Sequence, residues 1–205
     1  MANALYLSGK WATPFKKKET YNDFFYSESG EKQSVPFMHG VQNLQYNIMD
    51  NCESIEMPFG NSSFSMIIAL PKPENTVYDV LRDSEWINAE RKPCRVELSL
   101  PKFTISVKHE LKEVLQKLGL DKLFAANSIP GIYEDLTVTF VQQNSYFKIE
   151  EEGVEAAAVT SAGASDMAPM FADKAKMDIN RPFVFVIREN STKTALFMGK
   201  IATLK

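Results

Sequence analysis

The chain has 205 residues, a hydrophobic fraction of 44%, a charged fraction of 24% and a formal net charge of −3. This composition is typical of a soluble globular protein and argues against a disordered or fibrous chain. No basic run indicates a nucleic-acid partner, and no apolar stretch approaches the ~18 residues of a membrane-spanning helix. The two cysteines, Cys52 and Cys94, match no metal-binding or redox spacing, so we expect unpaired thiols in or near the core.

The first clear elements lie between residues 65 and 107. Residues 65–70 form a short apolar run that suits a strand buried on both faces. A helix is expected to start near Asn75, a good capping residue, and to bury Val77, Val80 and Leu81. Two segments then alternate between apolar and polar residues, as half-buried strands do. Their apolar members are Val96, Leu98 and Leu100, followed by Phe103, Ile105 and Val107.

A second helix and a further strand are predicted before residue 150. Apolar residues recur at helical spacing in an amphipathic pattern, at Leu111, Val114, Leu115 and Leu118. Gly119 is placed to end that helix. Alternation then returns at Leu136, Val138 and Phe140, which predicts another half-buried strand.

Residues 152–179 carry no clear periodic pattern and are interpreted as a long loop, which is uncommon inside a compact domain and often functional. The sequence at 150–164 is EEEGVEAAAVTSAGA. It lacks the bulky residues of an ordinary strand and the turn residues of an ordinary loop. Its small side chains fit a segment that can enter a crowded sheet. We expect the acids at 150–152 to be a hydrated approach to this loop rather than a cation site.

Two apolar runs, 183–187 and 194–202, are separated by polar residues and predict a hairpin. Because strands outnumber helices, the predicted class is α+β with β dominant. No phosphate-binding loop, zinc-protease motif or Cys-x-x-Cys is present. No nucleophile elbow accompanies His39 or His109, so the sequence favours neither an enzyme nor a metal or cofactor site.

Segments throughout the chain resemble the serpins, a family of serine protease inhibitors. They are 3–11 (NALYLSGKW, with Phe15 after it), 35–39 (VPFMH), 57–72 (MPFGNSSFSMIIALPK), 96–103 (VELSLPKF), 150–160 (EEEGVEAAAVT), 181–190 (RPFVFVIREN) and 196–202 (LFMGKIA). Their order and spacing resemble the C-terminal half of a serpin. The resemblance implies a multi-sheet serpin fold, treated as a single partial domain over 1–205. The family's N-terminal helices and part of its main sheet would be missing, through natural truncation, artificial shortening or a protein split into two chains.

The resemblance also implies a mechanism. A protease attacks the reactive loop at about 152–179, an acyl-enzyme forms, and the cleaved loop inserts into the main sheet with a large conformational change. The implied hinge comprises Glu151, Gly153, Val154, Glu155, Ala156, Ala157, Ala158, Val159 and Thr160. In an inserted strand, residues 154, 156, 158 and 160 would face the interior, and 155, 157, 159 and 161 would face outward. Every inward residue is small or medium, which argues for an inhibitory member.

The family's usual spacing, counted from Gly153, implies a reactive bond at Met167-Ala168. Met170-Phe171, or a bond beside Asp166, stays an alternative because the following segment is a few residues long. A methionine at the attacked position indicates an elastase-like or chymotrypsin-like serine protease as the target.

The resemblance further assigns Asn3, Trp11 and Gln143 to the region where the main sheet opens. Many members have a histidine at the position of Gln143, which bonds to an asparagine matched by Asn3. We expect the chain not to inhibit by itself, and to associate with an N-terminal half or with itself. The alternative is a non-inhibitory binding module or self-associating fragment. Family resemblance favours secretion to an extracellular or periplasmic location, although no signal is visible.

Overall fold

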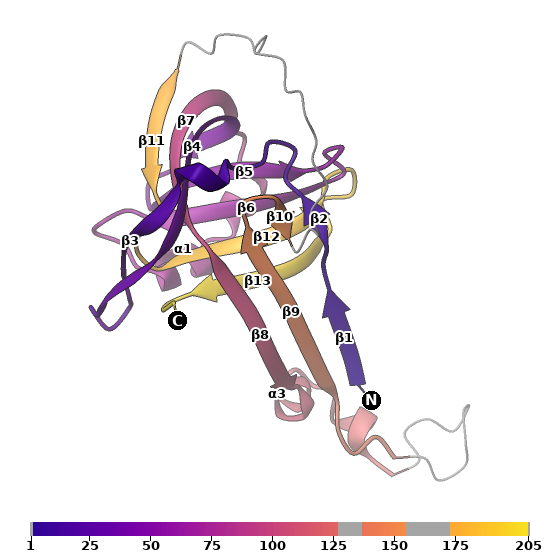
Figure 1. The fold of residues 1–205 in the computed structure, drawn as a ribbon. Helices are drawn as coiled ribbons and strands as arrows, with labels where there is room; N and C mark the ends of the chain where they lie inside the picture. The colour runs from indigo at the N-terminus through magenta and orange to yellow at the C-terminus, as the bar shows by residue number, and fades with distance from the viewer. Residues whose placement is uncertain (1, 127–136, 155–172, 205) are drawn as a thin grey trace. The chain divides into compact units, whose positions relative to one another are not determined.

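Strands dominate the part of the chain that this computed structural model describes, which is residues 2–126, 137–154 and 173–204 (Figure 1). This confirms a β-dominant α+β class. The residues divide into two compact units. The first unit is Met1–Ser8 with Thr104–Lys148, and the second is Gly9–Phe103 with Ile149–Lys205.

An eight-stranded sheet forms the second unit, in the order β11-β7-β4-β5-β6-β12-β13 with β3 beside β4. All neighbouring pairs are antiparallel except β11 and β7, which run parallel. The strands are β3 (Thr20–Tyr26), β4 (Lys32–Ile48), β5 (Cys52–Phe59), β6 (Phe64–Pro71), β7 (Lys92–Pro101), β11 (Lys174–Asp178), β12 (Phe183–Glu189) and β13 (Ala195–Ile201).

The core of this unit lies around the adjacent strands β6 and β12, whose continuous apolar runs are buried on both faces. Helices α1 (Val77–Arg82) and α2 (Glu85–Asn88) contribute Val77, Val80 and Trp86 to the main apolar cluster. The buried run at 65–70, the alternation at 96–100 and the C-terminal hairpin are confirmed. Cys52 and Cys94 are free and buried, as expected.

Helix α1 differs from its prediction at both ends. Its N-cap is Thr76, not Asn75, because the Thr76 and Asp79 side chains form a reciprocal capping box. Leu81 is exposed rather than buried. A helix of six residues turns a narrow face to the sheet, and that face is taken by Val77 and Val80.

The first unit contains β1 (Ala2–Tyr6), most of β8 (Phe103–Glu110), α3 (Lys112–Lys117), η2 (Asp121–Phe124) and most of β9 (Gln142–Glu150). β9 pairs with β1 in parallel and also with β8. Helix α3 buries none of its residues, and Val114 and Leu118 are exposed, so the predicted amphipathic helix is shorter and less covered than expected. Gly119 follows it with φ +87°.

The strand predicted at 136–140 is wrong for its described part, because residues 137–141 pair with no strand and β9 begins at Gln142. The carbonyl of Val141 instead accepts a hydrogen bond from the amide of Leu111 at 2.8 Å, beside the start of α3. Leu136 lies outside the described residues. Val107 is more exposed than its alternation predicts.

The remaining elements are β2 (Gly9–Lys10), η1 (Lys17–Glu19) and β10 (Gly153–Val154). Strand formation at both ends corrects the predicted loop of 152–179, because β10 and β11 lie within it. Residues 155–172 lie outside the described part. Among the described residues, no helix has the length and apolar character needed to cross a membrane.

Candidate functional site at the base of the predicted loop

The chain reverses direction immediately after β9. β10 pairs antiparallel with the end of β9 and with β2, so Gly153 lies opposite both Glu150 and Lys10. Gly153 has φ +131°, and a Cβ atom there would lie 2.2 Å from the carbonyl oxygen of Gly9 and 2.7 Å from the amide nitrogen of Trp11. The conformation and the close approach of two backbones therefore both require glycine.

Trp11 holds this turn from the other side. Its ring is buried and stacks on Phe59 with centroids 4.5 Å apart. Its indole Nε1 donates to the carbonyl of Glu150 at 2.9 Å, and its backbone amide donates to the carbonyl of Glu152 at 2.8 Å. The amide of Phe15 donates to the carbonyl of Glu151 at 2.8 Å. The carbonyls of three successive residues, 150–152, at the start of the predicted hinge thus bond to the short segment 11–15.

The three acids in this turn face lysines. Lys102 Nζ lies 2.9 Å from the carboxylate of Glu151 and 3.5 Å from that of Glu150, and Lys17 Nζ lies 3.0 Å from that of Glu152. The expectation of a hydrated acid run is wrong for Glu151, which is buried. Among the described residues, no group of three or more acids, histidines and cysteines could hold a metal ion.

The protonation of Glu151 follows from this pairing. Burial by itself raises the pKa of the Glu151 carboxyl, but hydrogen bonds from Lys102 and from its own backbone amide outweigh it and hold the pKa below the ordinary value. Glu151 therefore stays ionised, and its ion pair with Lys102 attaches the turn to the residue that follows β7.

Asn3 and Gln143 come together across two strands. They are register partners in the parallel pair β1 and β9, within five matched pairs from Ala2↔Gln142 to Tyr6↔Tyr146. The Nε2 atom of Gln143 donates to Ser145 Oγ at 3.5 Å, and Asn3 is exposed. At these five residue pairs β1 and β9 bond directly to each other.

On the far side of the predicted loop the chain enters the eight-stranded sheet as β11. This strand matches β7 from Lys174↔Arg95 to Asp178↔Ser99. Met177 and the following Ile179 are fully buried, and the amide of Ile179 donates to the carbonyl of Ser99 at 2.9 Å. Both ends of the predicted loop are therefore held by sheet hydrogen bonds.

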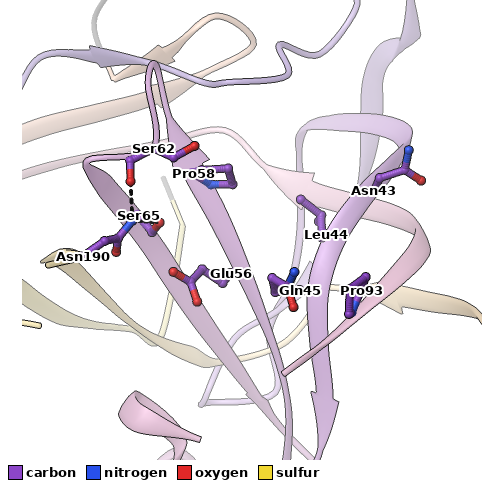
Figure 2. Close-up of a pocket in the computed structure, with 9 residues that line it drawn as sticks. All are labelled: Asn43, Leu44, Gln45, Glu56, Pro58, Ser62, Ser65, Pro93 and Asn190. Carbon is purple, nitrogen blue, oxygen red and sulfur yellow. Dashed lines mark hydrogen bonds between the residues drawn. The ribbon is translucent and has the colours of Figure 1, made fainter. Parts of the chain in front are cut away.

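A cavity of about 290 Å³ lies where β4 and β5 diverge (Figure 2). Glu56 lines it, and this carboxylate also accepts from Arg188 Nη2 at 3.2 Å. Asn190, which follows β12, donates from Nδ2 to the carbonyl of Ser62 and to Ser65 Oγ, each at 2.7 Å. The cavity wall thus combines apolar residues (Leu44, Pro58 and Pro93) with polar ones, and its one acid is matched by an arginine.

Several predicted positions meet at the turn, and others lie outside the described residues. Trp11, Glu151 and Gly153 lie together, and the backbone of Val154 is in β10. Glu155, Ala156, Ala157, Ala158, Val159, Thr160, Met167, Ala168, Met170 and Phe171 lie outside the described residues. The sequence interpretation missed Lys102, Lys17 and Gly9, which contact the turn, and Phe59, which stacks on Trp11. Each comes from a distant part of the chain and carries no local signal.

Comparisons with known proteins identify the family of the chain. The family model described as "Serpin (serine protease inhibitor)" matches residues 1–204. A serine protease inhibitor of Cyanea capillata is 33% identical over 98% of this chain and 56% of that protein, and the leukocyte elastase inhibitor of Xenopus tropicalis is 32% identical over 99% and 57%. The crystal structure of Serpin48 from Tenebrio molitor aligns with a TM-score of 0.85 and 27% identity, over 100% of this chain and 56% of that one. The chain spans about half the length of these relatives.

Proposed function

The chain belongs to the serpin family, and from this membership we propose that it carries the reactive loop of a serine protease inhibitor. The observation that supports this most is the turn at 150–153. There the chain leaves β9, reverses direction and pairs with the end of β9 again as β10. A hydrogen bond from Trp11 and an ion pair with Lys102 hold this turn. Relatives named as inhibitors of serine proteases and of elastase align over nearly the whole chain.

The proposed chemistry takes place in the loop backbone. The serine hydroxyl of the protease attacks the carbonyl carbon of Met167, the bond to Ala168 breaks, and the new amino group of Ala168 leaves with a proton. The Met167 carbonyl is then an ester on the protease. The inhibitor supplies a peptide bond and no catalytic side chain, so Met170-Phe171 would serve in the same way.

The proposed trapping step is loop insertion. β10 already runs antiparallel to β9, and its continuation would pass between β1 and β9. Insertion would separate the five parallel register pairs of these strands and give each an antiparallel neighbour. Antiparallel pairing is slightly more stable per residue than parallel pairing, which favours the inserted form. The small residues at 156, 158 and 160 would enter without displacing core side chains.

Two alanines provide a matched test. Ala158→Glu would bury an unpaired carboxylate in the inserted strand, which costs several kcal/mol, whereas Ala157→Glu would keep its carboxylate hydrated on the other face. The measurement is the yield of SDS-resistant complex with chymotrypsin and elastase, using the whole gene product where it is longer than 205 residues. We expect A158E to be cleaved without complex and A157E to behave as the parent.

Mass spectrometry of the released fragment would identify the reactive bond. Equal complex yields from the two variants, or no cleavage between residues 155 and 172, would contradict the proposal. The 205-residue chain tested by itself should be cleaved without forming a stable complex, because among the described residues β1 pairs with β9 alone, and an opened sheet needs a second neighbour to hold β1 in place.

Self-association is a second candidate function, favoured by the edge of β1. Within the described residues β1 pairs with β9 alone, and Asn3 and Ala4 are exposed. An open strand edge of this kind pairs with another chain. Light scattering after gel filtration should therefore give a mass above one chain, and Ala4→Pro should lower it. A monomeric parent chain would exclude this candidate and leave the inhibitory proposal untouched.

A further inference from the structure

Another cavity of about 290 Å³ lies within the second unit, near the start of α1. Its wall comes from the turn after β3, the end of β6, the start of α1 and the segment that leads into β12. Pro71, Val77 and Pro182 form its apolar part. Ligand pockets combine such apolar surface with a few placed polar groups, so the polar groups of the wall decide what this cavity can bind.

Arg181 places a cation in the wall. Its Nε and Nη2 atoms donate to the carbonyl of Pro71 at 3.1 and 2.7 Å, and its Nη1 atom has no partner among the described residues. Burial lowers the pKa of the guanidinium, and Glu53 and Asp178 offset this effect only in part. Both acids have closer partners, because Glu53 accepts from a tyrosine hydroxyl at 2.8 Å and Asp178 pairs with a lysine at 3.2 Å. The charge of Arg181 is therefore available to a ligand.

The acid of the wall, Glu28, is already neutralised. Lys200 Nζ donates to Glu28 Oε2 at 3.0 Å and to the hydroxyl oxygen of Tyr78 at 2.8 Å, and Glu28 and Tyr78 both line the cavity. Because the Tyr78 oxygen accepts from Lys200, its own hydroxyl proton stays available to a further acceptor. The wall thus gains a second donor and loses its free negative charge.

Asn75 adds a third donor to the wall. Its Oδ1 atom is buried without a hydrogen-bond partner, and a ligand in the cavity cannot reach a buried atom. Only Nδ2, which donates to no described residue, can therefore meet a ligand. The hydroxyls of Ser27 and Thr76 also belong to the wall, but they already bond to neighbouring side chains.

We propose that this cavity binds a small organic carboxylate with an apolar body. The carboxylate would accept a charge-assisted hydrogen bond from Arg181 and a second bond from Tyr78 or Asn75. The hydrocarbon part would cover the two prolines and Val77. Inorganic phosphate fits less well because it leaves the apolar wall uncovered, and a cation would be repelled by Arg181. This inference is independent of the proposed inhibitory function.

The test is titration with sodium phenylacetate at neutral pH, measured by calorimetry and by the amide NMR spectrum, using the whole gene product where it is longer than 205 residues. We expect a dissociation constant of about 1 mM or lower, as is usual for a ligand of this size. The amide shifts should centre on residues 75–78 and Arg181. Phenylacetamide has the same shape without the charge, so it should bind at least about tenfold more weakly.

Two variants locate the site. Arg181→Gln removes the charge but keeps a donor for the carbonyl of Pro71, so phenylacetate should bind at least about tenfold more weakly. Its matched control is Arg95→Gln, which alters an exposed arginine of β7 outside the cavity and should bind as the parent does. Should Arg181→Gln fold poorly, Tyr78→Phe removes only a hydroxyl and should weaken binding by about fivefold. Its control is Tyr21→Phe, at an exposed tyrosine of β3.

Three results would overturn the proposal. They are no binding at about 10 mM phenylacetate, equal affinity for phenylacetamide, and unchanged affinity in Arg181→Gln or, where that variant does not fold, in Tyr78→Phe. None of these measurements uses a protease, so they stay valid if the protein proves not to be an inhibitor.

Discussion

Replacing Gly153 with alanine should destabilise the second unit through two separable effects. The added Cβ would lie within 2.7 Å of three backbone atoms in Gly9, Lys10 and Trp11. Backbone atoms cannot rotate away as a side chain can, so β2 must shift, and overpacking of this kind costs about 1–3 kcal/mol. A non-glycine residue at φ +131° adds about 1–3 kcal/mol. We expect a total near 3–4 kcal/mol, or more than about a hundredfold in the unfolding equilibrium.

Urea unfolding followed by tryptophan fluorescence measures this loss, because Trp11 and Trp86 both lie in the second unit. The matched control is Gly60→Ala. Gly60 also has positive φ, +45°, but a Cβ there would meet no atom within 4 Å, so it should lose only about 1 kcal/mol. Equal losses from the two variants would show that the clash at Gly153 has no energetic weight.

Three further predictions concern the same unit. Trp11→Phe keeps an aromatic ring but removes the indole donor and part of the buried ring volume. The free energy of unfolding should fall by about 1–2 kcal/mol for the bond and further for the cavity; no change would mean that neither contributes. Lys102→Met leaves Glu151 buried without its cation and should cost about 3 kcal/mol at pH 7 in urea unfolding. The pKa of Glu151 lies below 4.5, so its ion pair with Lys102 stabilises the fold above that pH and is lost as the pH falls further. The loss in unfolding free energy caused by Lys102→Met should therefore shrink in acid. A loss that stays constant with pH would refute the pairing. Burial raises the pKa of the Cys52 thiol to about 11 and also raises that of Cys94, so mass spectrometry should find neither alkylated by iodoacetamide at pH 8 until the chain unfolds.

Elements with a complete periodic pattern could be predicted from the sequence. Val96, Leu98 and Leu100 alternate and are all fully buried, and the apolar run at 183–187 forms a central strand. β11 could also have been found, because Ala175, Met177 and Ile179 alternate with polar residues. In each case the side-chain pattern and the burial have the same cause, which is a pleated strand with at least one covered face.

Where the predicted secondary structure was wrong, pairing with distant strands determined which segments became strands. Residues 137–140 alternate, yet no strand forms there, while the more polar β9 does form because β1 and β8 pair with it. At the turn, Gly153 was recognisable from its neighbours in sequence, but Lys102 was not. A lysine at a polar position of an alternating segment carries no sign of the carboxylate that it will meet 49 residues later.

The unbroken length of β4 limits how the larger sheet can open. This strand of 17 residues pairs with β3 through residues 32–38, with β5 through residues 45–48, and with β7 from Phe37 to Tyr46. A slip of one residue would turn every side chain to the opposite face, so no part of the strand can slide by itself. The centre of the sheet should therefore exchange its amides as one cooperative foldon, while β3 and β11, each paired on one side within the described chain, fray at much lower free energy.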